Sequence, residues 1–368
     1  MCDSCGTMRL LTLLLALLAF ACGAPKQPAQ TAPTAQMSAG PTQGSEAAAA
    51  PIPAPPPAPA PPPPPTRIAF GSCNDVKKPQ VLWEQIAGLE PTAFVWLGDI
   101  VYADTQDIAV MRRSYDELKA LSAYVALTQK TRVIGTWDDH DYGGDDAGKE
   151  YPKRAESQQA LLDFLDEPQD SARRTQAGVY TTVDLGTDPY RVRVILLDTR
   201  FNRDQPGPAS DILGEEQWAW LRAQLEGSTA AVHILASSIQ VLPEQHGFEK
   251  WANFPSAKAR LLALLDELSP RNMVVISGDR HFAELSKLER GPGKAPLYDL
   301  TSSSLSKPWT KAPQELNRYR VGDVVWDVNF GLIEIDWSAA EPAIHLQIQS
   351  RNGAIGIDQL IPLEGAKP

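Results

Sequence analysis

The sequence has no excess of positive charge. Its 34 lysines and arginines stand against 45 aspartates and glutamates, which gives the 368-residue chain a formal net charge of -11. This balance argues against a nucleic-acid partner, because binding to a phosphate backbone depends on basic surface. It fits cation binding, although many soluble proteins are acidic without binding metal. We therefore expect no nucleic-acid-binding surface.

A hydrophobic run long enough for a comfortable membrane span is also missing near the N-terminus. The run over residues 10–20 is shorter than the about 20 residues that a transmembrane helix needs. It follows Arg9 and precedes small residues around Cys22, which is the build of a secretory signal. This junction resembles a bacterial lipoprotein cleavage site with Cys22 as the lipidated residue, although Phe20 is bulky there. Residues 1–22 are predicted to export the chain to the periplasm or cell surface and to anchor it to the membrane through lipid on Cys22. Ordinary cleavage or a retained anchor are the alternatives.

Residues 23–66 have little that could form a core, since Ala, Pro, Gln, Thr and Ser dominate them. Such a segment cannot bury enough apolar surface to offset its ordering entropy, so a disordered linker is predicted. Its proline-rich part, residues 51–65, favours polyproline II and would span about 45 Å at roughly 3.1 Å per residue. The simplest role is a tether that holds a folded domain away from a membrane; an SH3-type ligand is the alternative.

Cysteine is scarce, with four in the whole chain. If the signal is removed, only Cys22 and Cys73 remain, and if Cys22 carries lipid, Cys73 has no intramolecular partner. A lone thiol in an oxidising compartment is expected to be buried or bound to a metal. A buried, inert cysteine is the other interpretation.

From Thr66 onward, strand-like apolar runs alternate with segments of helical periodicity, and no internal repeat is evident. This pattern predicts one α/β domain over residues 67–365 with mixed sheets, no internal boundary and antiparallel later strands. Ser256 is the expected N-cap of one of the helices. The expected strands lie within 66–74, 92–105, 130–141, 190–200, 231–238, 272–285, 296–305, 329–337 and 343–350. The expected helices lie within 79–89, 107–121, 154–167, 214–227 and 256–268.

Five of the strand-like runs end on side chains that commonly bind metals. These side chains are Cys73; Asp99 with Tyr102; Asp138, Asp139, His140 and Asp141; Asp198 with Arg200; and Asp279 with His281. Ligands of α/β folds bind beyond the carboxyl ends of strands, where loops bring distant residues together. A single Gly-Asp after a strand is more often a turn, but five such ends in one domain indicate a shared site. Carboxylates packed this closely repel one another unless a cation lies between them.

The side chains at these ends offer two kinds of donor. Thiolate and imidazole favour transition metals, whereas carboxylates accept hard cations such as Ca²⁺, Mg²⁺ or Mn²⁺. We expect two metal positions. Cys73 and His281 would bind the softer metal, Asp139 and Asp279 the harder one, and Asp99 would bridge the two. Two metals about 4 Å apart can hold both the attacking and the leaving oxygen of a displacement at phosphorus. Phosphate-ester hydrolysis is therefore the predicted reaction.

Six motifs carry a more specific signal. In chain order they are FGSCN, WLGDIVYADT, TWDDHDYGGDDAG, VILLDTRFNRD, ASSIQVLPEQHGFEKWANFP and VVISGDRHFAEL. Together they resemble the PhoD-like alkaline phosphatases, a branch of the calcineurin-like metallophosphoesterases, over residues 67–335. The resemblance implies a four-layer α/β/β/α sandwich and a centre of Fe³⁺ and Ca²⁺, other divalent cations being possible. By motif, the iron would be surrounded by Cys73, Asp99, Tyr102 and His281, and the calcium side would be reached by Asp99, Asp139 and Asp279.

The resemblance also implies roles beyond metal binding. His140 takes the position of the catalytic histidine and would stabilise developing charge or protonate the leaving alkoxide. The nucleophile would be a metal-bound hydroxide. Arg200 and Arg280 would cradle phosphate oxygens, surface pairing with nearby acids being the alternative for each. Tyr102 has an alternative as a core aromatic. Three other acids of the third motif could bind metal, support the residues that bind it, or simply lie in a solvated loop. They are Asp141, Asp145 and Asp146.

Two features depart from the wider superfamily and leave the ligands of the second metal open. The superfamily's fourth motif usually supplies a histidine after a strand, where this chain has Ser237, Ser238 and Gln240. The superfamily's first motif usually reads Asp-x-His, where this chain has Cys73. Among the remaining histidines, His233 is expected to be structural, His345 to lie on a strand, and His246 either to line the substrate mouth or to be structural.

Three further interpretations stay open. The same fold could act on a phosphodiester or a phospholipid head group rather than on a small phosphate monoester. A surface protein could hold metal without turnover, although such a protein has no need of His140. A metal-free esterase using one of residues 302–304 lacks a nucleophile-elbow pattern and leaves the acids unexplained.

Overall fold

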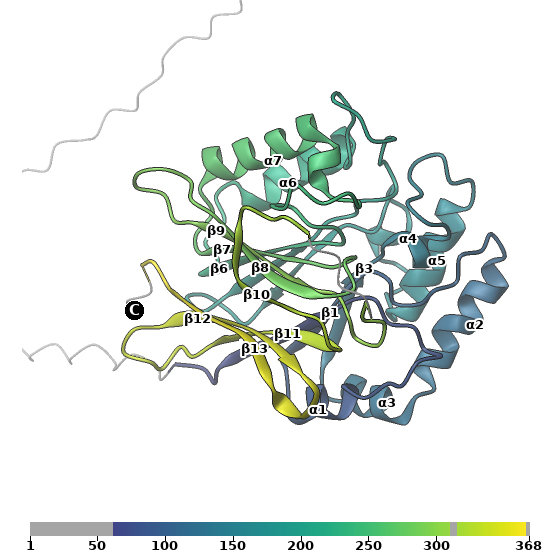
Figure 1. Ribbon diagram of the computed structural model, residues 1–368, viewed down its shortest axis with the longest axis horizontal. Coiled ribbons are helices and arrows are strands. Elements are labelled where there is room, and N and C mark those ends of the chain that lie inside the picture. Colours follow the sequence, from purple (N-terminus) through teal and green to yellow (C-terminus); the bar gives the residue numbers. More distant parts are fainter. Residues whose placement is uncertain (1–61, 310–314, 366–368) are drawn as a thin grey trace, which may run out of the picture. The chain divides into compact units, whose positions relative to one another are not determined.

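The computed structural model describes residues 62–309 and 315–365, which form two mixed β-sheets flanked by helices (Figure 1). The predicted signal peptide, Cys22 and nearly all of the predicted linker lie outside the described residues, so these stay predictions. Within the described ranges no helix has both the length and the apolar character that crossing a membrane requires.

The first sheet has six strands in the order β13-β12-β11-β1-β2-β3. Its strands are β1 (Thr66–Gly71), β2 (Ala93–Leu97), β3 (Arg132–Thr136), β11 (Asn329–Ile335), β12 (Ala343–Ser350) and β13 (Ile355–Pro362). β1, β2 and β3 are parallel, whereas β11, β12 and β13 join them as an antiparallel series. The first three strands therefore end at the same edge of the sheet.

The second sheet has seven strands in the order β10-β8-β9-β7-β6-β5-β4. Its strands are β4 (Thr181–Leu185), β5 (Val192–Leu196), β6 (Val232–Ser237), β7 (Met273–Ser277), β8 (Ala283–Leu288), β9 (Leu297–Ser302) and β10 (Arg320–Val325). β5, β6, β7 and β9 are parallel, and β4, β8 and β10 pair antiparallel. This sheet, too, presents several strand ends at one edge.

The sequence of β2 shows why the sheets are covered on both sides. All five of its residues are buried. Ala93, Val95 and Leu97 pack in the core between the two sheets, while Phe94 and Trp96 point to the opposite face. Because side chains alternate along a strand, a continuous apolar run requires a covering layer on each face.

Helices supply these outer layers (Figure 1). The first sheet is covered by α1 (Trp83–Gly88), α2 (Ile108–Lys119), α3 (Ser122–Thr128) and α5 (Arg154–Phe164), whose aromatic residues pack on Phe94 and Trp96. The second sheet is covered by α6 (Glu215–Leu225) and α7 (Pro255–Leu268). One short helix, α4 (Asp139–Tyr142), lies directly after β3. The expected four-layer α/β/β/α sandwich of two mixed sheets is confirmed.

The sequence pattern does not separate α4 and β8 from the strands that precede them, and four further elements lie outside every expected segment: α3, β4, β10 and β13. The three strands are all at sheet edges, where one neighbour suffices and the apolar pattern is weak. The predicted N-cap was wrong: α7 begins at Pro255, and Ser256 instead donates a hydrogen bond of 2.6 Å to the carbonyl of Pro208. Proline is suited to this first helical position, because its φ is already helical and the N–H it lacks would be unpaired there.

Gly98, which joins β2 to Asp99, permits a close approach to the loop after β3. Its φ is 89°, and a Cβ there would lie 2.4 Å from the Cβ of Asp138. We expect Gly98→Ala to lower the free energy of unfolding by about 3 kcal/mol or more, since steric overlap adds to backbone strain. The matched variant Gly227→Ala has a similar φ of 66° and open space, so it should cost only about 1–2 kcal/mol. Denaturant unfolding measures both, and equal losses would contradict the steric explanation.

Candidate metal centre

Residues after β1, β2 and β7 adopt an uncommon backbone conformation. Cys73, Asp99, Asp279 and His281 have φ values of 56°, 50°, 73° and 57°, in the left-handed region that non-glycine residues seldom adopt. Such conformations cost of order 1–3 kcal/mol each and gather at functional sites. Four of them at neighbouring strand ends therefore mark these loops as a site.

The first group of side chains surrounds Asp99. Cys73, Asp99 and His281 each offer one ligand atom, all within 4.8 Å of one another. The thiol of Cys73 lies 3.2 Å from Asp99 Oδ2, and the Tyr102 hydroxyl donates a 3.0 Å hydrogen bond to the same oxygen. The Tyr102 hydroxyl is also 3.4 Å from His281 Nε2. The four residues predicted around the iron are thus in contact.

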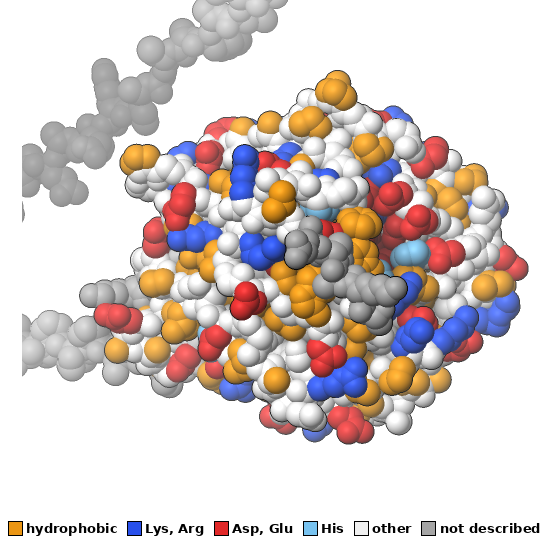
Figure 2. All heavy atoms as spheres, viewed as in Figure 1, with side chains coloured by type: hydrophobic (Ala, Val, Ile, Leu, Met, Phe, Trp, Pro, Cys, Tyr) orange, Lys and Arg blue, Asp and Glu red, His pale blue; other side chains and the backbone are white. Residues whose placement is uncertain are grey.

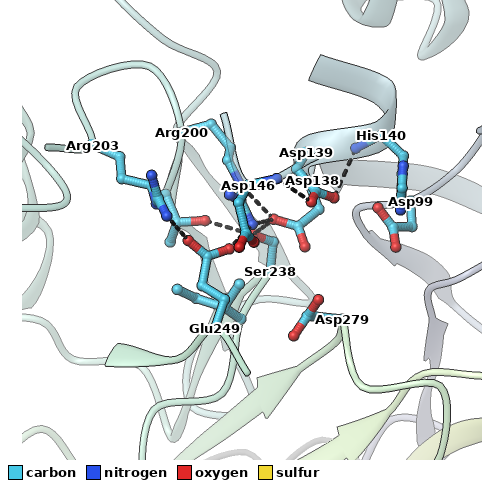
Figure 3. Close-up of polar contacts among 12 residues, drawn as sticks. Asp99, Asp138, Asp139, His140, Asp146, Arg200, Arg203, Ser238, Glu249 and Asp279 are labelled. Atoms are coloured by element: carbon cyan, nitrogen blue, oxygen red, sulfur yellow. Dashed lines mark hydrogen bonds and ion pairs between the residues drawn. The ribbon is translucent and has the colours of Figure 1, made fainter. Parts of the chain in front are cut away.

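The second group lies on the other side of Asp99. Asp99, Asp139 and His140 also offer atoms within 4.8 Å of one another. The carboxylate of Asp139 accepts the backbone N–H groups of His140 at 2.8 Å and of Asp146 at 2.7 Å, which fixes its direction. In Figure 3 the carboxylates of Asp99, Asp139 and Asp279 face a common space. Asp99 is therefore shared between the two groups, as a bridging ligand would be.

Several carboxylate oxygens in this space accept no hydrogen bond from the described residues, although Nη1 of Arg280 lies 3.9 Å from one of them, Asp279 Oδ2. Among the described residues, Asp99 Oδ1, Asp138 Oδ2 and Asp279 Oδ2 are buried without a hydrogen bond. Burial raises the pKa of Asp99 well above its usual range, and the charges of Asp139 and Asp279 add to this rise. Burial likewise raises the pKa of Asp279 to about 7, against the opposing charge of Arg280. Unpartnered, mutually repelling oxygens of this kind fit a cation site.

The thiol and the imidazole of the first group are buried as well. Burial raises the pKa of the Cys73 thiol, and the charge of Asp99 raises it further. Burial lowers the pKa of His281 to about 4. The hydrogen bond to the carbonyl of Lys307 opposes this shift, and the ammonium charge of Lys307 adds to it. A neutral imidazole is the form that binds metal, and its Nδ1 is 2.6 Å from the carbonyl of Lys307. Nε2 therefore faces Tyr102 as the free ligand atom, because Nδ1 carries the proton that this carbonyl accepts.

Asp141 holds the loop after β2 in place. One carboxylate oxygen accepts the backbone N–H groups of Asp99 at 3.1 Å and Asp138 at 2.8 Å, and the other accepts that of Ile100 at 3.3 Å. Of the roles left open for Asp141, these contacts favour a side chain that supports the ligand-bearing loop. The side chain fixes the backbone that carries Asp99, and both of its oxygens are used.

His140 occupies the mouth of the site. Its Nδ1 is 2.6 Å from Asp104 Oδ1, and its ring centroid lies 4.2 Å from that of Tyr102. Burial opposes protonation of the ring, but the hydrogen bond to Asp104 and the charge of Asp139 raise the pKa of His140. His140 is partly exposed. Figure 2 shows acidic side chains gathered beside histidine side chains on the face in view.

Arg200 is fully buried and forms ion pairs with Asp138 and Glu249 (Figure 3). Ser238, which follows β6, donates a 2.6 Å hydrogen bond to the same Asp138 oxygen that Arg200 contacts. Arg203 pairs with Glu249 from the other side. This network holds Asp138 beside the ligand groups and leaves the guanidinium of Arg200 enclosed by protein.

Arg280 is also engaged by an acid. Its guanidinium forms two 2.6 Å hydrogen bonds with Glu315 and lies 4.4 Å from the ring centroid of Phe248 and 5.5 Å from that of Trp309. For Arg200 and Arg280 the structure therefore shows the alternative of pairing with acids, inside the protein rather than at its surface. The cradling of phosphate by either arginine stays a prediction.

The other singled-out side chains have structural partners. Gln240 donates hydrogen bonds to Glu284 and Thr301, and buried His233 contacts the carbonyl of Arg271 and the hydroxyl of Ser228. His246 is buried beside the aromatic ring of Phe248, and His345 on β12 pairs with Asp358. Asp198 accepts backbone N–H groups from Val179, Arg200 and Phe201.

Ser303, Asp104 and Lys307 are site residues that sequence reasoning missed. The hydroxyl of Ser303 accepts the backbone N–H of His281 at 2.9 Å and lies 3.0 Å from the Cys73 thiol. Ser303 belongs to the run 302–304, which was considered only as a source of esterase nucleophiles. The hydroxyl groups of Ser302 and Ser304 are completely buried, so neither is placed to attack a substrate.

The layers and the cluster at the strand ends define a calcineurin-like metallophosphoesterase. The chain belongs to the PhoD-like phosphatase family, whose model matches residues 68–324. It is 27% identical over 195 residues to alkaline phosphatase D of Bacillus subtilis (strain 168); the match covers 42% of this chain and 32% of that protein, about a third of the relative's length.

Solved structures agree on the fold. The structure of PhoD matches with a TM-score of 0.63 at 17% identity, covering 83% of this chain and 74% of that one. GAP50, described as the anchor in the inner membrane complex of Plasmodium, matches with a TM-score of 0.57 at 14% identity over 82% of this chain and 89% of its own. A dimetal phosphatase from Danio rerio matches with a TM-score of 0.50 at 12% identity over 81% and 99%. At such identities the likeness concerns the fold alone.

Proposed function

We propose that this chain is an exported, metal-dependent phosphatase that hydrolyses phosphate esters at a centre of more than one cation. The proposal is carried by the convergence of Cys73, Asp99 and His281 within 4.8 Å, with unpartnered carboxylate oxygens beside them. A transferring phosphoryl group needs fixed positive charge close by, which such a centre provides. Membership of the PhoD-like phosphatase family supports the reaction class.

The donor set divides as thiol, phenol and imidazole on one side and carboxylates on the other. The first side, Cys73, Tyr102 and His281, suits Fe³⁺, and the second, Asp139 and Asp279, suits Ca²⁺, while Asp99 is shared. When bound, cations would neutralise phosphate charge and make a water more acidic at neutral pH. The chain itself fixes the donors, because they lie on loops with left-handed backbone conformations and are held by backbone hydrogen bonds.

In this proposal His140 donates a proton to the leaving alkoxide. With Nδ1 bonded to Asp104, the protonated ring has its Nε2–H free to donate. As the bond from phosphorus to the ester oxygen breaks, this proton passes to that oxygen and leaves His140 neutral. Asp104 would hold the imidazole in the orientation and charge state that this step requires.

The test of the proposed function is metal reconstitution, with Cys73→Ser as the informative variant. Protein loaded with iron and calcium should hydrolyse 4-nitrophenyl phosphate and lose this activity in EDTA. Cys73→Ser should lose iron and its visible thiolate charge-transfer band, keep calcium, and lose activity by about 10–100-fold or more. Ser304→Ala, which removes a neighbouring buried hydroxyl, should keep metal and activity. Undiminished turnover in EDTA would contradict the proposal.

A second candidate is a surface protein that holds metal without turnover, as the match to a protein described as an anchor suggests. Activity of the metal-loaded protein on either a phosphomonoester or a phosphodiester excludes it. The ratio of turnover of 4-nitrophenyl phosphate to that of bis(4-nitrophenyl) phosphate then separates the monoesterase from the phosphodiesterase or phospholipase D-type alternative.

We also propose that residues 1–22 export the chain and that lipid on Cys22 anchors it to a membrane. The apolar run after Arg9 and the small residues around Cys22 support this proposal. Recovery of the full chain in a soluble rather than a membrane fraction of the producing cell would count against the anchor.

A further inference from the structure

Two lysines near the site, Lys250 and Lys307, form no ion pair with any carboxylate of the described residues. The ammonium of Lys250 donates hydrogen bonds to the carbonyl of Phe248 and to the side chain of Asn253. Arg200 and Arg280 are both engaged by carboxylates, as described above. Lys307 forms no ion pair with any carboxylate of the described residues, and the neighbouring residues 310–314 contain no acid. Its ammonium instead lies 3.3 Å from the ring centroid of Tyr102. Among the described residues, Lys307 is therefore a positive charge at this face of the metal centre that neither an ion pair nor a hydrogen bond of its ammonium engages.

The backbone fixes Lys307 beside the ligands. Its carbonyl oxygen accepts a 2.6 Å hydrogen bond from Nδ1 of His281, and the N–H of Trp309 donates to the carbonyl of His281 at 3.0 Å. The N–H of Ser306, the preceding residue, donates to the carbonyl of Cys73 at 3.3 Å. The loop that carries Lys307 is thus bonded to two of the loops that carry metal ligands, so its side chain is positioned with them.

The ring under the ammonium belongs to the site itself. The hydroxyl of Tyr102 contacts Asp99 and His281, and its ring centroid is 4.2 Å from that of His140. Lys307 consequently lies one side chain away from both the ligand group and the proposed proton donor. An ammonium resting on an aromatic face is free to turn to a stronger partner, and a phosphate oxygen is such a partner.

We infer that Lys307 binds a terminal oxygen of the substrate phosphate and makes this site prefer phosphomonoesters to phosphodiesters. The inference rests on the proposed function. A monoester carries two negative charges near neutral pH and presents a terminal oxygen at a position where a diester carries its second ester group. A single lysine charge interacts more strongly with the dianion, and the second ester group removes one of the oxygens that it can contact.

Lys307→Met tests this inference, because it keeps the long side chain over Tyr102 and removes the charge. We expect kcat/KM for 4-nitrophenyl phosphate to fall about 10–100-fold, which corresponds to about 1.4–2.8 kcal/mol, and kcat/KM for bis(4-nitrophenyl) phosphate to fall less than about threefold. Lys307→Arg should retain most of the monoester activity. The control Lys287→Met, a lysine over the ring of Tyr298 that pairs with Glu289, should change neither rate.

Binding of inorganic phosphate provides a readout that does not depend on turnover. Calorimetry of the metal-loaded proteins should show phosphate affinity weakened about tenfold or more in Lys307→Met, with metal content and Tm unchanged. Equal phosphate affinity in the variant, or an equal loss on both esters, overturns the inference about Lys307. Hydrolysis of neither ester by the metal-loaded wild type would instead overturn the proposed function, and the phosphate titration would still decide the role of Lys307.

Discussion

Replacing His140 by alanine is expected to lower kcat on phosphate esters by about 10²–10⁴-fold while iron and calcium stay bound. The imidazole carries the proton that is proposed to pass to the leaving group. Without the imidazole, the alkoxide has to leave unprotonated. Of the ligand atoms, only that of Asp139 lies next to His140 in the chain, and its direction is fixed by backbone N–H groups that the variant retains. Steady-state kinetics together with metal analysis measures the effect.

A second histidine–aspartate pair provides a matched control. His345 pairs with Asp358 between β12 and β13 as His140 pairs with Asp104, but it is remote in sequence from every ligand loop. His345→Ala should keep full activity. Loss of metal in His140→Ala would show that this residue is a ligand, and full activity with metal bound would remove it from the mechanism.

Asp99→Asn is expected to abolish metal binding and activity, yet to leave the metal-free protein at least as stable as the wild type. Burial, reinforced by the charges of Asp139 and Asp279, raises the pKa of Asp99. A group whose pKa is raised by folding destabilises the protein at pH values above its unfolded pKa of about 3.9, so near neutral pH the carboxylate is a liability unless cations are bound. Asparagine removes the destabilising carboxylate charge, and with it the ligand that would bridge the two cations.

Thermal unfolding with and without metal tests this expectation. Cations that bind only the folded wild type at 100 times their Kd add about 2.7 kcal/mol, so EDTA should lower its Tm, whereas the Tm of Asp99→Asn should not respond. Asp299→Asn is the control: Asp299 is an equally buried acid that accepts N–H groups of Val241 and Leu242. Asp299→Asn should keep the response of Tm to metal. A metal-responsive Asp99→Asn would remove Asp99 from the centre.

The local sequence predicted the strands that carry the site. β1, β2, β3, β5 and β7 all lie within strands expected from the sequence, and each is followed within two residues by a polar residue or a glycine. Such strands have few alternatives once a core is available, because burying them requires a sheet covered on both faces. Edge strands such as β4, β10 and β13 carry weaker patterns, and the neighbouring strand decides them.

The partners of charged side chains could not be predicted in the same way. Arg200 follows a strand end just as the acids do, and nothing in its local sequence indicates that Glu249, 49 residues later, would enclose it. Lys307 lies in a segment without regular structure, and its position depends on a hydrogen bond to His281. Ser303 reaches Cys73 across 230 residues of sequence.

By itself, the sequence determined which residues could serve as ligands and that they would lie at strand ends, because strand periodicity and donor chemistry are local properties. Only the tertiary structure decided which donors share one space, which arginines are paired with acids and that, among the described residues, Lys307 rests on Tyr102 without an ion pair. These outcomes depend on distances between loops of two different sheets, and such distances are set by packing of the whole core rather than by any segment of the chain.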